Sequence, residues 1–124
     1  MRVRSTTRPV ALAAVLAGGL AAGAAKPDAA AGKVVYDREC ASCHGGTGKG
    51  DGDDAAYFTT KPPNFTDPAV LPKRSDDFLA AVITEGGPSK GLSKDMPATK
   101  LSAGDIKSVV AYLRQLSGRA KSSK

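Results

Sequence analysis

Apolar and small residues recur with helical spacing in three segments of the chain, and no segment keeps the period-two alternation that is typical of a β-strand. In the first segment, residues 29–41, Gly32, Tyr36 and Cys40 occur at every fourth position and therefore share one helical face. A small residue beside an aromatic residue on that face indicates a close crossing with another helix. The pattern as a whole predicts an all-α domain.

The second predicted helix begins after Ser75, whose side chain can cap its first turn. Asp76 and Asp77 follow, and negative charges at this place stabilise the positive end of a helix. The Gly86-Gly87-Pro88 sequence is expected to end it. The apolar face of this helix consists of Leu79, Val82 and Ile83.

The third predicted helix has the most regular pattern. Ser102 and Asp105 form a capping box at its start, with Asp in place of Glu, and Gly118 is expected to end it. Beyond Gly118, residues 119–124 form a basic tail that is expected to be disordered. One face of the helix carries Ile106, Val109, Val110, Leu113 and Leu116, so it must pack against another part of the domain.

Two long loops join these helices. Residues 45–74 are rich in Gly, Pro and Asp and are expected to hold at most a short helix at 53–58, and residues 86–101 form the second loop. Loops of this length are uncommon in a small domain. The three Tyr and three Phe residues are also few for filling a core. A large apolar cofactor among the loops would supply both order and apolar volume.

The N-terminus has the pattern of a secretory signal peptide. Arg2, Arg4 and Arg8 precede residues 10–25, which contain only Ala, Val, Leu and Gly. Cleavage is expected near Ala25, so that residues 1–25 are removed and residues 26–118 form the mature domain. An uncleaved membrane anchor is the alternative, but these 16 residues are fewer than the roughly 20 that a spanning helix needs.

The net charge and the arrangement of the basic residues limit the classes of partner that the protein can bind. Cleavage would remove three of the 18 basic residues and none of the 12 acidic ones, which lowers the formal charge from +6 to +3. The basic residues do not form the runs or aromatic-interleaved stripes that nucleic-acid binding favours. Nucleic acid is therefore not expected as a partner.

Residues 40–44 have the sequence Cys-Ala-Ser-Cys-His, the C-x-x-C-H motif of covalent haem attachment. The thiols of Cys40 and Cys43 can each form a thioether with a haem vinyl group, and His44 can then reach the iron. A redox dithiol usually accompanies a βαβ pattern, and a structural zinc site needs four ligands, whereas the chain has two Cys and one His. A plain disulfide stays open in an oxidising compartment. Export agrees with the haem, because such attachment takes place outside the bacterial cytoplasm.

The second axial position of the iron is commonly filled by Met in low-spin electron carriers. Met96 is the only Met left after signal removal, and it stands in a loop before Pro97 rather than on an apolar helical face. We therefore expect His44 and Met96 to be the iron ligands. Lys94, Lys100 or an open position are the alternatives.

In this order the motifs resemble those of the class I c-type cytochromes over nearly all of the mature chain. The resemblance implies a cytochrome c-like fold, in which three main helices and long loops surround one covalently attached haem c. It also implies that the first and last helices cross at the glycine and the aromatic residues. The match rests on Gly32, Tyr36, residues 40–44, residues 48–52, Pro63-Asn64-Phe65, Met96-Pro97-Ala98 and Tyr112-Leu113.

The resemblance assigns two further residues to the haem site. It implies that the Pro63 carbonyl accepts a hydrogen bond from the far ring nitrogen of His44, with Pro62 as the alternative, and that Phe65 packs against the haem. Thr99 departs from the family pattern, because relatives often have an aromatic residue after Met-Pro-Ala.

These features predict an exported, periplasmic mono-haem protein that carries one electron between a donor and an acceptor, rather than an enzyme. Lys90, Lys94 and Lys100 could steer it to acidic docking surfaces on redox partners. The mature protein is expected to be a soluble monomer. The alternatives are a gas-binding or peroxidase-like haem protein with an open sixth position, and a fixed haem subunit of a larger oxidoreductase.

Overall fold

The computed structural model describes residues 10–11, 13–14, 18–19 and 26–122, so most of the expected signal peptide and its cleavage site lie outside the described residues. The described part contains four α-helices and two short 3₁₀ helices, and it contains no strand, which confirms the all-α class. None of its helices combines the length and the apolar character that crossing a membrane requires. The elements are α1 (Ala29–Glu39), α2 (Ala41–His44), η1 (Asp53–Tyr57), α3 (Asp76–Glu85), η2 (Gly87–Lys90) and α4 (Ala103–Ser122).

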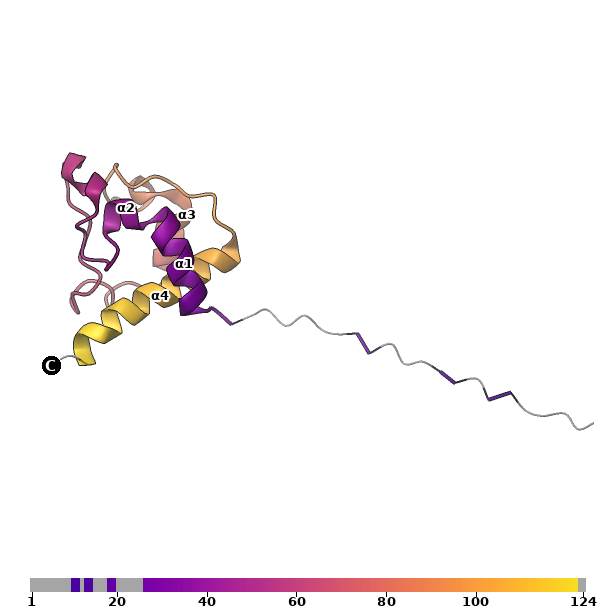
Figure 1. Cartoon of the computed structure of the whole chain (residues 1–124). Coiled ribbons are helices and arrows are strands. Elements are labelled where there is room, and N and C mark those ends of the chain that lie inside the picture. Colours follow the sequence, from indigo (N-terminus) through magenta and orange to yellow (C-terminus); the bar gives the residue numbers. More distant parts are fainter. Residues whose placement is uncertain (1–9, 12, 15–17, 20–25, 123–124) are drawn as a thin grey trace, which may run out of the picture.

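The first and last main helices cross closely (Figure 1). Gly32 of α1 lies so near the backbone of α4 that a Cβ atom on it would overlap the carbonyl oxygen of Ser108. Beside this point the ring of Tyr36 packs edge-on against Tyr112, with 5.2 Å between the ring centroids. The Tyr36 hydroxyl donates a hydrogen bond of 2.7 Å to the Gly45 carbonyl. The crossing expected at these residues is present, and it is tied to the chain that follows α2.

The first helix is shorter than the sequence pattern predicted. Asp28 caps α1 by accepting a hydrogen bond from the Ala30 N–H, but α1 ends at Glu39, because Cys40 leaves helical geometry with φ −120° and ψ −30°. A separate turn, α2, starts at the next residue. The Cys40 N–H still donates to Tyr36, and the Cys40 carbonyl accepts from His44, so the bend loses no backbone hydrogen bond at this residue.

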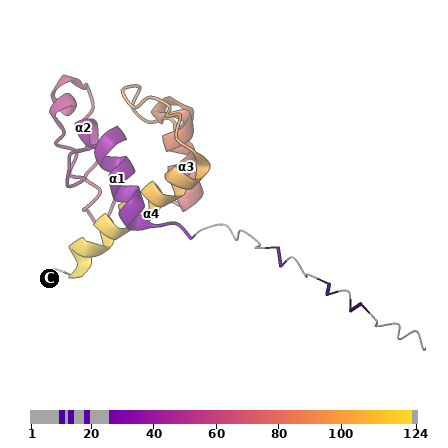
Figure 2. The same cartoon turned by 45° about the vertical axis from the view of Figure 1, so that its right-hand side comes forward.

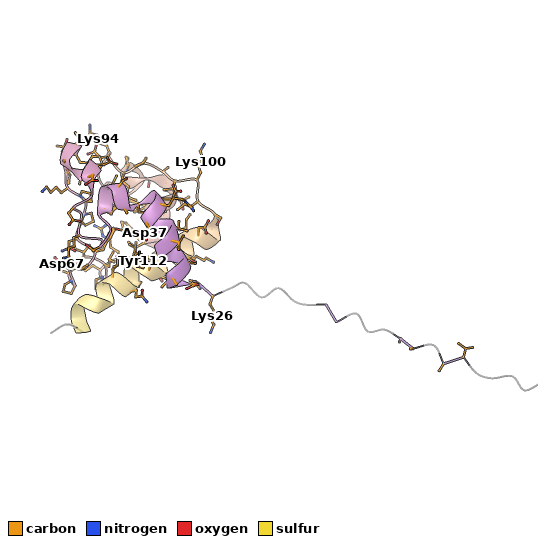
Figure 3. The ribbon with its side chains drawn as sticks, in the orientation of Figure 1. Lys26, Asp37, Asp67, Lys94, Lys100 and Tyr112 are labelled. Carbon is orange, nitrogen blue, oxygen red and sulfur yellow. The ribbon has the colours of Figure 1, made fainter. Side chains whose placement is uncertain are left out.

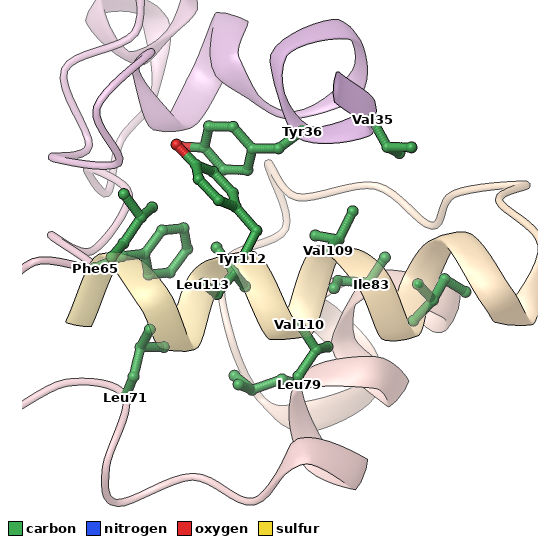
Figure 4. Close-up of a cluster of buried hydrophobic side chains, with 12 residues drawn as sticks. Val35, Tyr36, Phe65, Leu71, Leu79, Ile83, Val109, Val110, Tyr112 and Leu113 are labelled. Carbon is green, nitrogen blue, oxygen red and sulfur yellow. The ribbon is translucent and has the colours of Figure 1, made fainter. Parts of the chain in front are cut away.

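The core lies on the apolar face of α4 (Figure 4). Ser102 caps α4 by accepting a hydrogen bond from Asp105 N–H, and Ser75 caps α3 by accepting one from Phe78 N–H, each at 3.1 Å. Both caps were predicted. As well as Tyr112 and Ser117 of α4, all residues of the two predicted apolar faces are buried: Leu79, Val82, Ile83, Ile106, Val109, Val110, Leu113 and Leu116.

The end of the last helix differs from the prediction. Helix α4 continues through Gly118 to Ser122, so Gly118 does not end it. A glycine ends a helix by taking left-handed geometry, and Gly118 does not have a positive φ. Arg119, Ala120 and Lys121 follow it, and these are good helix formers. Residues 119–122 of the expected disordered tail are therefore helical, and residues 123–124 lie outside the described part.

Helix α4 lies beneath both sides of the domain (Figure 2). Helices α1 and α2 and the short helix η1 form one side, and α3 and η2 form the other. Among the described elements, α1 and α3 each contact α4 and do not contact each other. The two sides can therefore form opposite walls of a site.

Candidate haem site

A cavity of about 510 Å³ lies between the two sides of the domain, within the size range of cofactor sites. All six residues that the sequence predicted for the haem site line it: Cys40, Cys43, His44, Pro63, Phe65 and Met96. Aliphatic side chains from α3, α4 and the loops also line it: Leu71, Leu79, Val82, Ile83, Leu92 and Leu113. Residues far apart in the sequence thus meet around one apolar space.

The two cysteines stand where α1 gives way to α2, and both thiols are free. Burial, with smaller contributions from Glu39 and Cys43, raises the pKa of the Cys40 thiol to about 11. A redox-active dithiol needs a thiol with a lowered pKa, so this environment does not suit that alternative. No group of three or more potential metal-binding side chains (His, Cys, Asp or Glu) occurs in the described part, which gives the zinc alternative no support.

His44 is the last residue of α2 and turns its imidazole to the cavity. Its Nδ1 atom is buried and has no hydrogen-bond partner among the described residues. Burial lowers the pKa of His44 to about 4, because the charged imidazolium is poorly solvated there. At neutral pH the ring is therefore uncharged, which is the state that binds a metal.

The predicted hydrogen bond from His44 to Pro63 is absent, and Pro62 does not replace it. The imidazole instead stacks on the ring of Phe65, with 4.8 Å between centroids and 22° between planes. The Pro62 carbonyl lies against Gly50, where a Cβ atom would overlap it. This close approach holds the Pro62–Pro63 backbone against the preceding loop. Phe65 itself is 8 % exposed and lines the cavity, as expected of a residue that packs on the cofactor.

Met96 lies on the opposite wall, in the loop between η2 and α4. Its carbonyl accepts a hydrogen bond of 2.9 Å from the Gly87 N–H. Its side chain is partly buried and packs against the hydrophobic core. The structure thus places the thioether and the His44 imidazole on the same cavity, although 52 positions separate them in the sequence.

Sequence reasoning missed Arg114, which fixes part of the cavity wall. Its guanidinium donates hydrogen bonds to the Asp76 carboxylate at 2.8 Å and to the carbonyls of Leu71 and Arg74 at 2.7 and 2.5 Å. Leu71 and Arg74 both line the cavity. The one sequence signal is that a charged residue stands between apolar residues in the middle of α4. From periodicity alone, such a residue is expected to face the solvent.

The donor set fits one kind of prosthetic group. Two adjacent free thiols can form thioethers, a buried neutral imidazole has an unpaired nitrogen, and the wall of the cavity is mostly apolar. Because Nδ1 has no partner in the described part of the protein, the His44 ring is not committed to a hydrogen bond that would have to break before a cofactor binds. Together with the all-α fold, these features define a haem-binding domain of the c type.

The chain belongs to the cytochrome c family: the family model described as Cytochrome c matches residues 29–117. The cofactor of this family is covalently bound haem c, and residues 40–44 supply its C-x-x-C-H motif. The matched residues therefore form a cytochrome c domain. This confirms the family and the cofactor that the sequence predicted.

A similar solved structure is a chain of the reducing HAO-like protein complex of Kuenenia stuttgartiensis. The two chains are 30 % identical, with a TM-score of 0.58, and the match covers 76 % of the present chain. It covers 44 % of the other chain, so the present chain spans less than half of that neighbour's length. A search of curated protein sequences finds no match.

Proposed function

We propose that this chain is an exported, periplasmic electron carrier whose haem iron is ligated by His44 and Met96. One observation carries the proposal: His44 and Met96 line the same apolar cavity from opposite sides of the domain. Each is the only residue of its type after position 25, so no other His or Met can compete for the iron.

Each residue of the cavity has a separate task in this proposal. Cys40 and Cys43 would hold the cofactor covalently, and His44 and Met96 would ligate its iron. Bound haem c supplies a one-electron change between ferrous and ferric iron. The soft Met sulfur favours the reduced state, and the apolar wall limits the access of water. Because the same ligands serve both oxidation states, little has to move during transfer.

The first experiment is the visible and near-infrared absorption spectrum of the ferric holoprotein and of a Met96→Ala variant. We expect a low-spin spectrum with a weak sulfur-to-iron charge-transfer band at the red edge, and loss of this band in Met96→Ala. Leu92→Ala is a matched control, because Leu92 lines the same cavity and is not expected to bind iron. A high-spin parent spectrum without the band would refute the carrier and favour the gas-binding or peroxidase-like alternative.

The export part of the proposal agrees with where the folded domain begins. Helix α1 starts at Ala29 with Asp28 as its cap, so cleavage after Ala25 removes no part of it. Mass spectrometry of the haem-containing protein from a periplasmic fraction should give a chain that starts near Lys26. A chain that retains residues 1–25 in a membrane fraction would refute cleavage and support the anchor.

A second candidate, a fixed haem subunit of a larger oxidoreductase, is favoured by the similar chain that belongs to an HAO-like complex. We expect a monomeric shuttle instead. Haem staining of a native gel of the source organism's periplasm distinguishes the two. A haem band at the size of the mature chain supports the shuttle, whereas a haem band only at much higher mass supports the subunit.

A further inference from the structure

The carboxyl end of α3 forms hydrogen bonds with the loop between η2 and α4, residues 91–102, here called the Met96 loop. The last carbonyls of a helix lack partners within the helix and carry a partial negative charge. Val82 O accepts from the Gly86 N–H, but the Gly87 N–H, which would bond to Ile83 in a longer helix, donates to the Met96 carbonyl instead. The Ile83 carbonyl is therefore left to a partner outside the helix.

Thr99 supplies that partner twice. Its N–H donates to the Ile83 carbonyl at 3.1 Å, and its hydroxyl donates to the same oxygen at 2.9 Å. The bond from Gly87 to Met96 lies three residues upstream, so hydrogen bonds to the end of α3 flank Met96 and Pro97 on both sides. Thr99 also lines the haem cavity and is half-buried.

The backbone of α3 is shaped for this close approach. Gly86 has a positive φ of 88°, and a Cβ atom on it would lie 2.9 Å from the Ala98 nitrogen and 3.0 Å from the Met96 carbonyl oxygen. Only glycine avoids this contact without moving the loop. Pro97 further limits the loop, because a residue before proline is restricted to extended geometry.

We propose that Thr99 is a positioning residue whose hydroxyl fastens the Met96 loop to the end of α3 and so keeps the thioether at the iron. The proposal rests on the Met96 ligation proposed above. A threonine at this position thus gives the loop a side-chain hydrogen bond to α3. Losing the hydroxyl bond should let Met96 leave the iron more readily, while the main-chain bond from Thr99 is kept.

The test is a titration of the ferric holoprotein with imidazole, which must displace Met96 to bind. We expect Thr99→Val to bind imidazole about fivefold more tightly, the factor that corresponds to one net hydrogen bond of typical strength. Thr99→Ala should shift the affinity in the same direction, and it serves if Thr99→Val does not fold. Thr99→Ser should match the parent, because it keeps the hydroxyl.

Thr84→Val is the matched control. The Thr84 hydroxyl also donates to a carbonyl of α3, that of Ala80 at 2.8 Å, and this bond lies within the helix rather than joining it to the Met96 loop. Its loss should leave imidazole affinity unchanged. In a Met96→Ala background, where no thioether competes, Thr99→Val should have no effect on imidazole affinity.

Two results would overturn the proposal, and they differ in what else they affect. If the parent shows the sulfur-to-iron band but Thr99→Val binds imidazole as weakly as the parent does, only the role of Thr99 is refuted. If the parent lacks that band, both Met96 ligation and the role of Thr99 are refuted. Tighter imidazole binding in Thr84→Val as well would also refute it, since the effect would then not be specific to the loop.

Discussion

His44 is held in its neutral form by burial rather than by a charged neighbour. The pKa of this side chain falls from 6.5 to about 4, and the physical cause is loss of solvation of the imidazolium. A proton and the iron compete for the same ring. The protein environment therefore favours the metal over a pH range in which an exposed histidine would already be charged.

The His44 side chain should therefore stay unprotonated to a lower pH than an exposed histidine does. Because the pKa of His44 is lower in the folded chain than in the unfolded one, its contribution to stability is complete above pH 6.5 and is lost as the pH falls towards about 4. In the holoprotein the iron also holds the neutral ring, so we expect the low-spin absorption spectrum to persist at pH 5 and to be lost only below about pH 4. Absorption and circular dichroism during acid titration measure this, and loss of the low-spin spectrum near pH 6.5 would contradict it.

At the residue scale, the sequence pointed to side chains that the structure brings together at one cavity, because the haem-attachment motif is defined by its residue spacing. Cys40, Cys43 and His44 form one short motif, and Met96 follows from being the remaining sulfur ligand. The predicted bond from His44 to Pro63 is not formed in this structure, and it depends on how a ring and a loop orient in three dimensions. The hydroxyl contact of Thr99 also could not be predicted, because it depends on an unpaired carbonyl at the end of another helix.

Helix α4 is the element that joins the parts of the domain. Its contact with α1 depends on the absence of a side chain at Gly32, and its contact with the loop before α3 depends on the long side chain of Arg114. These two contacts respond to opposite changes. Adding a carbon atom disturbs the first, and removing polar atoms disturbs the second.

Gly32→Ala should lower the free energy of unfolding by about 3 kcal/mol, because its Cβ atom would force the backbones of α1 and α4 apart. Gly118→Ala is the matched control in α4, with nothing within 4 Å of the added atom. It should stabilise by about 0.5 kcal/mol, the helix preference of alanine over glycine. Urea unfolding of the holoprotein measures both, and equal effects of the two substitutions would contradict the close crossing.

Arg114→Met should lower the free energy of unfolding by about 2 kcal/mol, because it keeps the apolar stem but removes charged hydrogen bonds to two backbone carbonyls and to Asp76. Arg38→Met is the control. Arg38 forms its salt bridge with the adjacent Glu39 at the surface, so no measurable change is expected there. Comparable losses in both variants would show that Arg114 acts through its charge alone.

Most elements could be predicted from apolar spacing and caps, while their ends could not. Ser75 and Ser102 marked the starts of α3 and α4 correctly, because a cap is a local contact. The break at Cys40 follows no local rule, since the pattern of residues 29–41 continues through it. The passage of α4 through Gly118 shows that good helix formers after a glycine can outweigh the glycine as a stop signal.

The lysines that were predicted to steer the protein towards redox partners lie close in sequence to residues that line the cavity. Lys94 and Lys100 are exposed, and they flank the stretch of the Met96 loop that lines the cavity. Figure 3 shows both at the upper edge of the view, with Lys26 on the opposite side. Lys90 is engaged with Glu85 at 3.6 Å, so the steering predicted for the three lysines falls mainly on the other two.

Reversing Lys94 and Lys100 to Glu should slow oxidation by the anion hexacyanoferrate(III) about tenfold at low ionic strength. The difference should shrink towards none at about 1 M salt, where screening acts within about 3 Å. Oxidation by a cationic cobalt complex should respond in the opposite direction. Stopped-flow kinetics measure these rates.

Reversal of Lys26 and Lys107 changes the net charge equally and is the control, since neither residue lines the cavity. It should have a much smaller effect. Equal slowing by both double variants would mean that only the net charge matters, and that no local steering surface exists.

The contact of α1 and α3 with α4, but not with each other, bears on how the domain opens. Either side can separate from α4 without disturbing the contacts of the other, so local opening divides into two cooperative units. Amide hydrogen exchange should then fall into two classes. Amides of α1 and the facing half of α4 should exchange slowly and together. Those of α3 and the Met96 loop should exchange faster, on the side that carries the proposed iron ligand Met96 and not the two cysteines.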